Sequence, residues 1–202
     1  MLPPAMVAEV LSVPEGELKQ MKIMGCNYTW ESADEKQTAD ASIMSIWIKK
    51  DAAAARQWFE NATKTQTAEE IKAAMAKVKA KAKESKEVDT KVKEKTVDQI
   101  GDAVTGMLAQ GVTYEDVAGV GDAARVEKNE GALTVLVGNM VFNVRAYKGP
   151  PAPPPDMSAI KSGDMKQIMK ASKEASAKWM AETRDERQKL GTALAKAIVA
   201  KL

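Results

Sequence analysis

The sequence of 202 residues has no histidine and a single cysteine, Cys26. Histidine is the commonest general base and a frequent metal ligand, so its absence removes the usual catalytic triads and most transition-metal sites. One cysteine alone can form neither an intrachain disulfide nor a cysteine-based zinc site. Hydrolysis by paired carboxylates or by Ser/Lys chemistry stays open, but no carboxylate pair stands out for acid–base work. We therefore expect neither an enzyme nor a bound cofactor.

Long apolar runs and an excess of charge are lacking as well. No stretch of about 18 apolar residues occurs, so no membrane span is predicted. The net charge is only +2, whereas a nucleic-acid partner normally goes with a clustered basic excess, so we expect none. The opening residues, MLPPAMVAEVL, show no basic and apolar signal region. Composition thus leaves two alternatives: a cytosolic protein, or a mature form whose signal was removed.

The apolar residues that are present predict an α+β fold, an antiparallel sheet packed by helices. Residues 22–30 alternate in the period-2 pattern of a half-buried strand. Residues 41–48 alternate again, and there both faces of the predicted strand are apolar. A Gly-Val-Gly-Asp-Ala-Ala turn at residues 119–124 precedes three further short strands. With helices before and after each group of strands, the chain reads as two α-β-β-α half-repeats that share one sheet.

Composition divides the chain into three parts. Residues 1–149 form the predicted α+β domain, interrupted by a lysine-rich helical insertion at about 62–96. Five prolines make residues 150–157 a stiff, extended linker. Residues 158–202 are helical again, and we expect the last helix, 188–202, to pack on the domain.

Two groups of apolar side chains are candidate binding sites. Trp30, Trp47 and Trp58 are predicted to form one aromatic cluster, which is either core packing or the lining of an open cleft for an apolar ligand. Two helices carry narrow apolar stripes that a protein partner could cover. The stripe residues are Ile71, Met75 and Val78 in the insertion, and Met165, Met169 and Trp179 near the C-terminus. The lysine-rich face of the insertion is either solvated or a docking surface.

Two further motifs have structural explanations. The turn at 119–124 matches a dinucleotide fingerprint by letters, but a polar Tyr-Glu-Asp precedes it and a strand follows, so we interpret it as a turn. Met21, Met24 and Cys26 have the soft ligands that Cu(I) prefers. Their place on a strand favours ordinary core packing instead.

Several of these motifs occur together in a known group of proteins. The Cys26-x-Tyr28-x-Trp30 strand, the 119–124 turn, and a last helix reading LGTALAKAIVAKL follow one another in order. In this the chain resembles the small secreted or lipid-anchored bacterial envelope proteins of uncharacterised function best known from actinobacteria. The resemblance implies export to the periplasm or cell surface and an α+β sandwich, and it transfers no catalytic residue. Such proteins often pair the strand cysteine with a second cysteine, which this chain lacks.

The sequence and the resemblance together lead to one functional expectation and one alternative. We expect a non-enzymatic exported envelope protein, of the lipoprotein type, that acts as a binding or accessory module in a larger assembly. Its partner would be another protein or further copies of itself, and it would meet the membrane only through a lipid anchor since removed. The alternative is a carrier that holds a small apolar ligand between sheet and helices.

Overall fold

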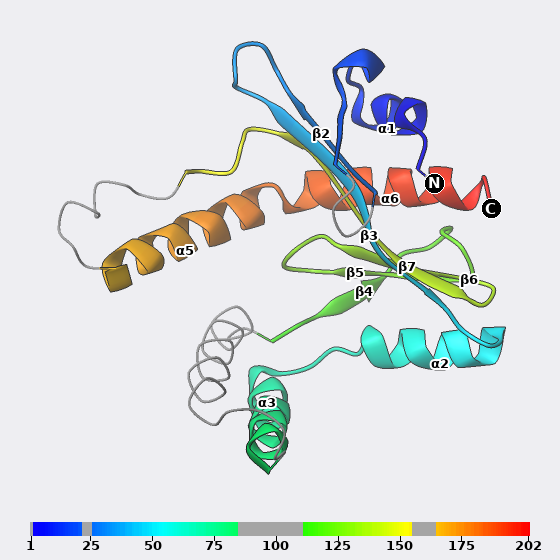
Figure 1. The fold of residues 1–202 in the computed structure, drawn as a ribbon, viewed down its shortest axis with the longest axis vertical. Coiled ribbons are helices and arrows are strands. Elements are labelled where there is room, and N and C mark those ends of the chain that lie inside the picture. Colours follow the sequence, from blue (N-terminus) through cyan, green and yellow to red (C-terminus); the bar gives the residue numbers. More distant parts are fainter. Residues whose placement is uncertain (1, 22–25, 85–110, 155–164) are drawn as a thin grey trace. The chain divides into compact units, whose positions relative to one another are not determined.

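The computed structural model describes residues 2–21, 26–84, 111–154 and 165–202 (Figure 1). The chain divides into two compact units, one of Met1–Thr63 with Glu115–Leu202 and a smaller one of Lys64–Tyr114. The smaller unit contains helix α3 (Ala68–Glu84), which begins the predicted insertion.

The larger unit is an antiparallel sheet with helices packed against it, which confirms the predicted α+β class. The strands are β1 (Lys19–Met21), β2 (Cys26–Glu31), β3 (Thr38–Ile48), β4 (Tyr114–Asp116), β5 (Ala123–Glu127), β6 (Leu133–Val137) and β7 (Met140–Gly149). The helices are α1 (Pro4–Leu11), a 3-10 turn η1 (Glu15–Glu17), α2 (Ala52–Ala62), α5 (Met165–Glu182) and α6 (Arg184–Val199).

The strands lie in the order β1-β2-β3-β7-β6-β5-β4. The long strands β3 and β7 form the centre, and each is the last strand of an antiparallel meander, β1-β2-β3 or β5-β6-β7. The sequence predicts a strand at residues 22–30, and the part of it that the structure describes, residues 26–30, lies in β2; residues 22–25 lie outside the described residues. Strand β1 was not predicted, and it folds back on β2 so that Lys19 pairs with Thr29.

One face of the sheet forms the main core with α1 and α6. Paired residues of neighbouring strands point to the same side, so Tyr28, Ala41 and Ala146 lie on one face across β2, β3 and β7. Helix α6 packs Leu190 and Leu194 against this face. Both side chains are buried, and α1 adds its own apolar side to the same cluster.

The opposite face is covered, at one end of the sheet, by α2. Asp51 caps this helix, and its Oδ1 accepts a hydrogen bond from the Ala54 amide at 2.7 Å. Phe59 of α2 is 1% exposed and packs with Leu136 and Val141 of the sheet. This second, smaller core fixes α2 below strands β6 and β7.

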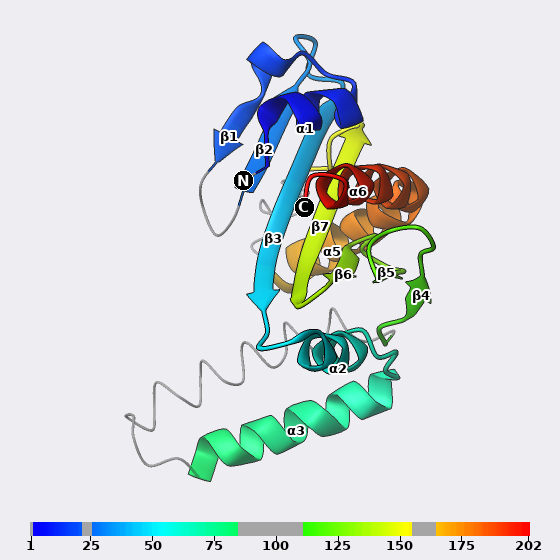
Figure 2. The same cartoon turned by 90° about the vertical axis from the view of Figure 1, so that its right-hand side faces the viewer.

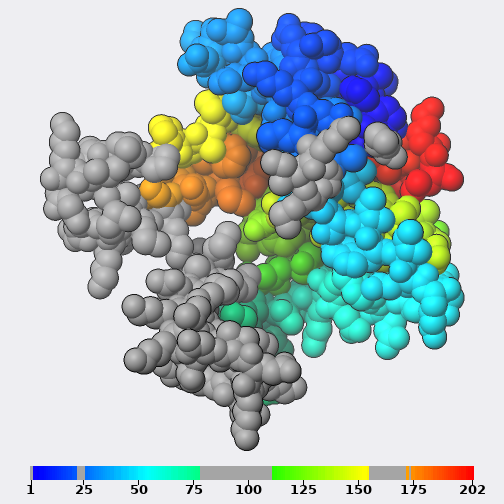
Figure 3. Space-filling model, in the orientation of Figure 1, coloured from blue at the N-terminus to red at the C-terminus, as the bar shows by residue number. Residues whose placement is uncertain are grey.

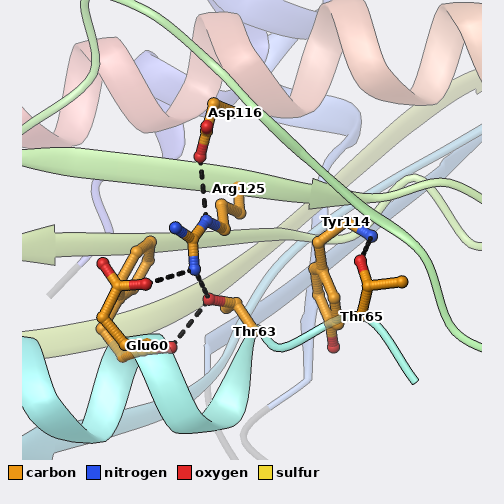
Figure 4. A network of polar contacts seen from close by, with 7 residues as sticks. Glu60, Thr63, Thr65, Tyr114, Asp116 and Arg125 are labelled. Carbon is orange, nitrogen blue, oxygen red and sulfur yellow. Dashed lines mark hydrogen bonds and ion pairs between the residues drawn. The ribbon is translucent and has the colours of Figure 1, made fainter.

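Arg125 of β5 ties the C-terminal end of α2 to the sheet (Figure 4). Its guanidinium contacts the Glu60 carboxylate at 2.7 Å and donates to the Thr63 hydroxyl at 2.9 Å. Its Nε donates to Asp116 at 2.8 Å, and the group lies 5.2 Å from the centre of the Phe59 ring. The hydrogen bonds that Arg125 donates to Asp116 and Glu60 raise its pKa, with burial acting against them, so the charged form of this side chain is favoured.

The segment at residues 119–124 is the turn that the sequence analysis predicts. Gly121 has φ +57°, and a Cβ built there would lie 2.5 Å from the Leu136 carbonyl oxygen, so only glycine fits. Asp122 accepts a hydrogen bond from the Gly138 amide at 2.6 Å, which links this turn to the β6–β7 turn. The following strand then begins at Ala123 without strain.

Candidate functional site

The C-terminal part of β3 forms an open edge in the middle of the sheet. On one side β3 pairs with β7 as far as Ile48, but on the other side its pairing with β2 ends at Ile43, opposite Cys26. Figure 2 shows β1 and β2 beside only the upper part of β3. Among the described residues, no strand lies beside residues 44–48 on the side away from β7. We call this side of residues 44–48 the β3 edge.

The backbone polar groups of Ile46 and Ile48 point outward along the β3 edge. The Lys49 amide donates to the Asn139 carbonyl of the β6–β7 turn at 2.8 Å. Hydrogen-bonded pairs alternate along an antiparallel ladder, so Trp47 and Ser45 are the next residues whose backbone groups face β7. Ile46 and Ile48 therefore present their N–H and C=O groups to the open side.

Three of the five side chains of the β3 edge are apolar and exposed to water. Ile46 is 57% exposed, Ile48 is 73% exposed, and Met44 is 45% exposed. Ile46 pairs with Phe142 and so lies on the face that α6 covers elsewhere. A β-bulge between Ile43 and Ser45 marks where the edge begins.

Two tryptophans flank the β3 edge on the other face of the sheet. Trp47 of β3 and Trp58 of α2 stack with ring centres 4.3 Å apart, and the Lys49 ammonium lies 4.8 Å from the centre of the Trp58 ring. Both rings are half-buried on the Phe59 cluster. In Figure 3 the cyan surface of α2 and the end of β3 lies next to the yellow-green surface at the start of β7.

The prediction that three tryptophans share one cluster is wrong for Trp30. Strand alternation puts Trp30 on the α1 and α6 face, the same side as Tyr28, and its indole Nε1 donates to the Glu17 carboxylate at 2.7 Å. Trp47 lies on the opposite face, because the bulge shifts the register by one residue between the two positions. Trp47 and Trp58 instead stack on each other and pack on the cluster around Phe59.

The predicted docking helices are described only in part. Ile71 is buried and Met75 half-buried within the smaller unit. The side chains of Val78, Met165 and Met169 lie outside the described residues.

Trp179 of α5 has its partners within the chain. Its ring meets Tyr147 edge-on at 5.1 Å, and its indole donates to the Pro150 carbonyl at 3.1 Å. The Tyr147 hydroxyl donates to the same carbonyl at 2.7 Å, and the Arg187 guanidinium lies 5.5 Å from the Trp179 ring centre. This residue anchors the start of the proline-rich linker, where the sequence suggested an external partner.

A polar hollow lies on the Trp47 side of β1, β2 and β3. It is a cavity of about 270 Å³ lined by Lys19, Thr29, Trp30, Glu31, Thr38, Ala39 and Asp40. Desolvation by the surrounding protein raises the pKa of Asp40, and the charges of Arg145 and Arg187 act against it. The side chain is still exposed to solvent, which screens these charges, so the effect on stability is small.

The arginines beside this hollow serve structural contacts. Arg187 is 8% exposed and donates to the Glu130 carbonyl at 2.6 Å and to the Met180 carbonyl, while Arg145 pairs with the Glu130 carboxylate. Burial lowers the pKa of Arg187, and the nearby Glu130 opposes this. These contacts join α6 to the β5–β6 turn. Both guanidinium groups are therefore engaged in contacts within the chain.

The β3 edge is a surface feature that the sequence did not predict. The pattern that could have indicated it is the predicted strand at residues 41–48, which is apolar on both faces. An antiparallel strand with one face in water normally alternates apolar and polar residues, so an unusual strand was to be expected here.

No family model, curated protein or solved structure matches the chain. In the described ranges, no helix is long and apolar enough to cross a bilayer, and no three His, Cys, Asp or Glu side chains gather as metal ligands.

Proposed function

We propose that the protein is a non-enzymatic binding module that takes up an extended protein segment as an added strand along the β3 edge. The observation that carries this proposal is the coincidence, at Ile46 and Ile48, of outward backbone groups and exposed apolar side chains. In strand addition, backbone hydrogen bonds supply affinity and alternate side chains supply specificity. The β3 edge offers both.

The other edges of the sheet are protected in ways that the β3 edge is not. The outermost strands, β1 and β4, have three residues each, and they carry Lys19 in one case and Glu115 and Asp116 in the other. Short length and charge are the usual defences against unwanted pairing. Residues 46–48 have no charge and no proline, which favours a pairing role.

Burial of the two isoleucines sets the scale of the interaction. Full burial of an isoleucine side chain contributes about 2 kcal/mol, and Ile46 and Ile48 still expose more than half of their surface. A strand that covers both would gain roughly 2–3 kcal/mol from them, before its hydrogen bonds and the packing on Trp47 are added.

The cellular setting belongs to the same proposal. Export to the cell envelope and an accessory role in a larger assembly are supported by the resemblance of the Cys26-x-Tyr28-x-Trp30 strand and the 119–124 turn. The gene sequence upstream of Met1 tests this part. A signal peptide with a lipid-modified cysteine would support it, and a cytosolic protein in fractionated source cells would contradict it.

Strand addition itself is tested with peptides selected from a display library on the purified protein. Bound peptides should slow amide hydrogen exchange at Ile46 and Ile48, whereas Trp47, whose amide faces β7, should change little. Ile46→Lys should abolish binding, and the matched control Met21→Lys, at an exposed methionine of β1, should leave it intact. Peptides that bind without protecting Ile46 and Ile48 would show that the site lies elsewhere.

A further inference from the structure

We propose that the strand which pairs with the β3 edge is the β3 edge of a second copy of this chain, so that the protein is a two-fold symmetric dimer. This inference rests on the proposed function, since it names the partner of the same surface. It follows from three properties of the edge: its side chains, its backbone register and its charges.

The side chains of the β3 edge complement themselves. A strand laid beside it must be aliphatic on the Ile46 and Ile48 face and apolar on the Trp47 face. The segment Ile46-Trp47-Ile48 itself has this alternation. A two-fold axis would place the isoleucines of both copies on one face of a continuous sheet and both Trp47 rings on the other.

The outward backbone groups limit this pairing to a few registers, and one of these pairs the two isoleucines with each other. The outward N–H and C=O groups belong to Ile46 and Ile48, so an antiparallel partner satisfies them when Ile46 of one copy faces Ile48 of the other. That arrangement forms about four hydrogen bonds between the copies, two for each such pair, and centres on Trp47 facing Trp47.

The rival register, with Ile46 facing Ile46, is obstructed. It would bring Lys49 of the second copy beside Ile43, a position already paired with Cys26 of β2. It would also pair Ile48 with Met44, which lies in the bulge where the ladder is irregular. In the register centred on Trp47, the residue that falls beside Ile43 is Asp51, which has already left the strand to cap α2.

The charges of the edge are compatible with a second copy in this orientation. Lys49 and Lys50 follow the strand at one end only, and the edge residues 44–48 are uncharged. An antiparallel two-fold pairing puts the two lysine pairs at opposite ends of the joined strands. A parallel pairing of two copies would put them side by side, and like charges directly opposite each other destabilise a sheet.

The register is tested by disulfide trapping in a Cys26→Ala background, which removes the only native cysteine. In the proposed register, residue 47 faces its own copy in a non-hydrogen-bonded pair with Cα atoms about 4.5 Å apart, within the range of a disulfide. Trp47→Cys should therefore form a covalent dimer under mild oxidation, and Ile46→Cys should not. Efficient trapping through Ile46→Cys alone would overturn the register.

Because Trp47→Cys removes a stacked ring, a second measurement uses the unaltered protein. Sedimentation at increasing concentration should show a monomer–dimer equilibrium, with slower amide exchange at Ile46 and Ile48 in the dimer. Ile46→Lys should raise the dimer dissociation constant about tenfold or more, since each of two symmetric contacts gains an unpaired charge, whereas Met21→Lys should not change it.

The outcomes separate this inference from the proposed function. A protein that stays monomeric, while display-selected peptides still protect Ile46 and Ile48, would refute the second copy and keep strand addition. A monomer with an edge that no peptide protects would refute both. A dimer that Ile46→Lys leaves intact would show that the copies meet through another surface.

Discussion

Replacing Arg125 by methionine should destabilise the protein by about 2 kcal/mol, because this side chain joins α2 to the sheet. The arginine side chain is only 23% exposed, but its carboxylate partners Glu60 and Asp116 are 47% and 85% exposed. Ion pairs this open contribute about 0–1 kcal/mol. The hydrogen bond to the buried Thr63 hydroxyl adds about 1.5 kcal/mol, and the contact with the Phe59 ring about 0.5 kcal/mol.

The assay for this prediction is urea unfolding of the wild type, Arg125→Met and Arg125→Lys. Methionine keeps the apolar stem, so the loss reports on the guanidinium, and the midpoint of thermal unfolding should fall by about 4–8 °C. Lysine keeps the charge but cannot reach three partners at once, so about half of the loss should remain. High salt should reduce the difference only in part, because the Thr63 bond is shielded.

A change below about 0.5 kcal/mol for Arg125→Met would refute the reasoning, since it would mean that α2 is held by the Phe59 cluster alone. The result also bears on the binding proposal. Helix α2 carries Trp58, which supports Trp47 beside the β3 edge. A variant with loosened α2 should therefore dimerise or bind peptides more weakly at temperatures where it is still folded.

Three further predictions concern the rest of the larger unit. Gly121→Ala should lower the unfolding free energy by about 3 kcal/mol or more, and Gly138→Ala by about 1 kcal/mol. Both glycines have φ near +57°, but only at Gly121 would an added Cβ meet backbone atoms. Equal unfolding midpoints of the two variants in urea would contradict this. The folded-state pKa of Asp40 is raised, so its ionised form weakens the fold at pH values above that pKa. Asp40→Asn should therefore be more stable than the wild type at pH 7, and this difference in unfolding free energy should vanish as the pH falls below the unfolded-state pKa of 3.8. A difference that grows in acid would contradict this prediction. Tyr147→Phe should lose about 1 kcal/mol in urea unfolding, as Pro150 loses one of its two donors, and an unchanged midpoint would show that the hydroxyl contributes nothing.

Local patterns in the sequence predicted much of the fold. Alternation identified the strand of Cys26, Tyr28 and Trp30, which lies in β2. The glycines of the 119–124 turn were interpretable because left-handed backbone requires them and the surrounding residues did not fit a nucleotide site. In each case the deciding interaction lies within a few residues along the chain.

The features that escaped prediction depend on long-range pairing. Trp30 and Trp47 were grouped because both are aromatic residues on strands, but a bulge after Ile43 changes which face each residue meets. Among the described residues, the β3 edge arises because β2 begins at Cys26, opposite Ile43, while β3 continues to Ile48; the relative lengths of two paired strands cannot be predicted from either segment alone. Trp179 found an internal partner in Tyr147 for the same reason.

The central claim is that the β3 edge is a pairing surface, and amide hydrogen exchange resolved at Ile46, Trp47 and Ile48 tests it most directly. In dilute protein without peptide, Ile46 and Ile48 should exchange fast and Trp47 slowly. Raising the protein concentration, or adding a selected peptide, should protect Ile46 and Ile48 and leave Trp47 unchanged. Slow exchange of all three residues in the dilute monomer, or fast exchange of Ile46 and Ile48 under every condition, would contradict the claim.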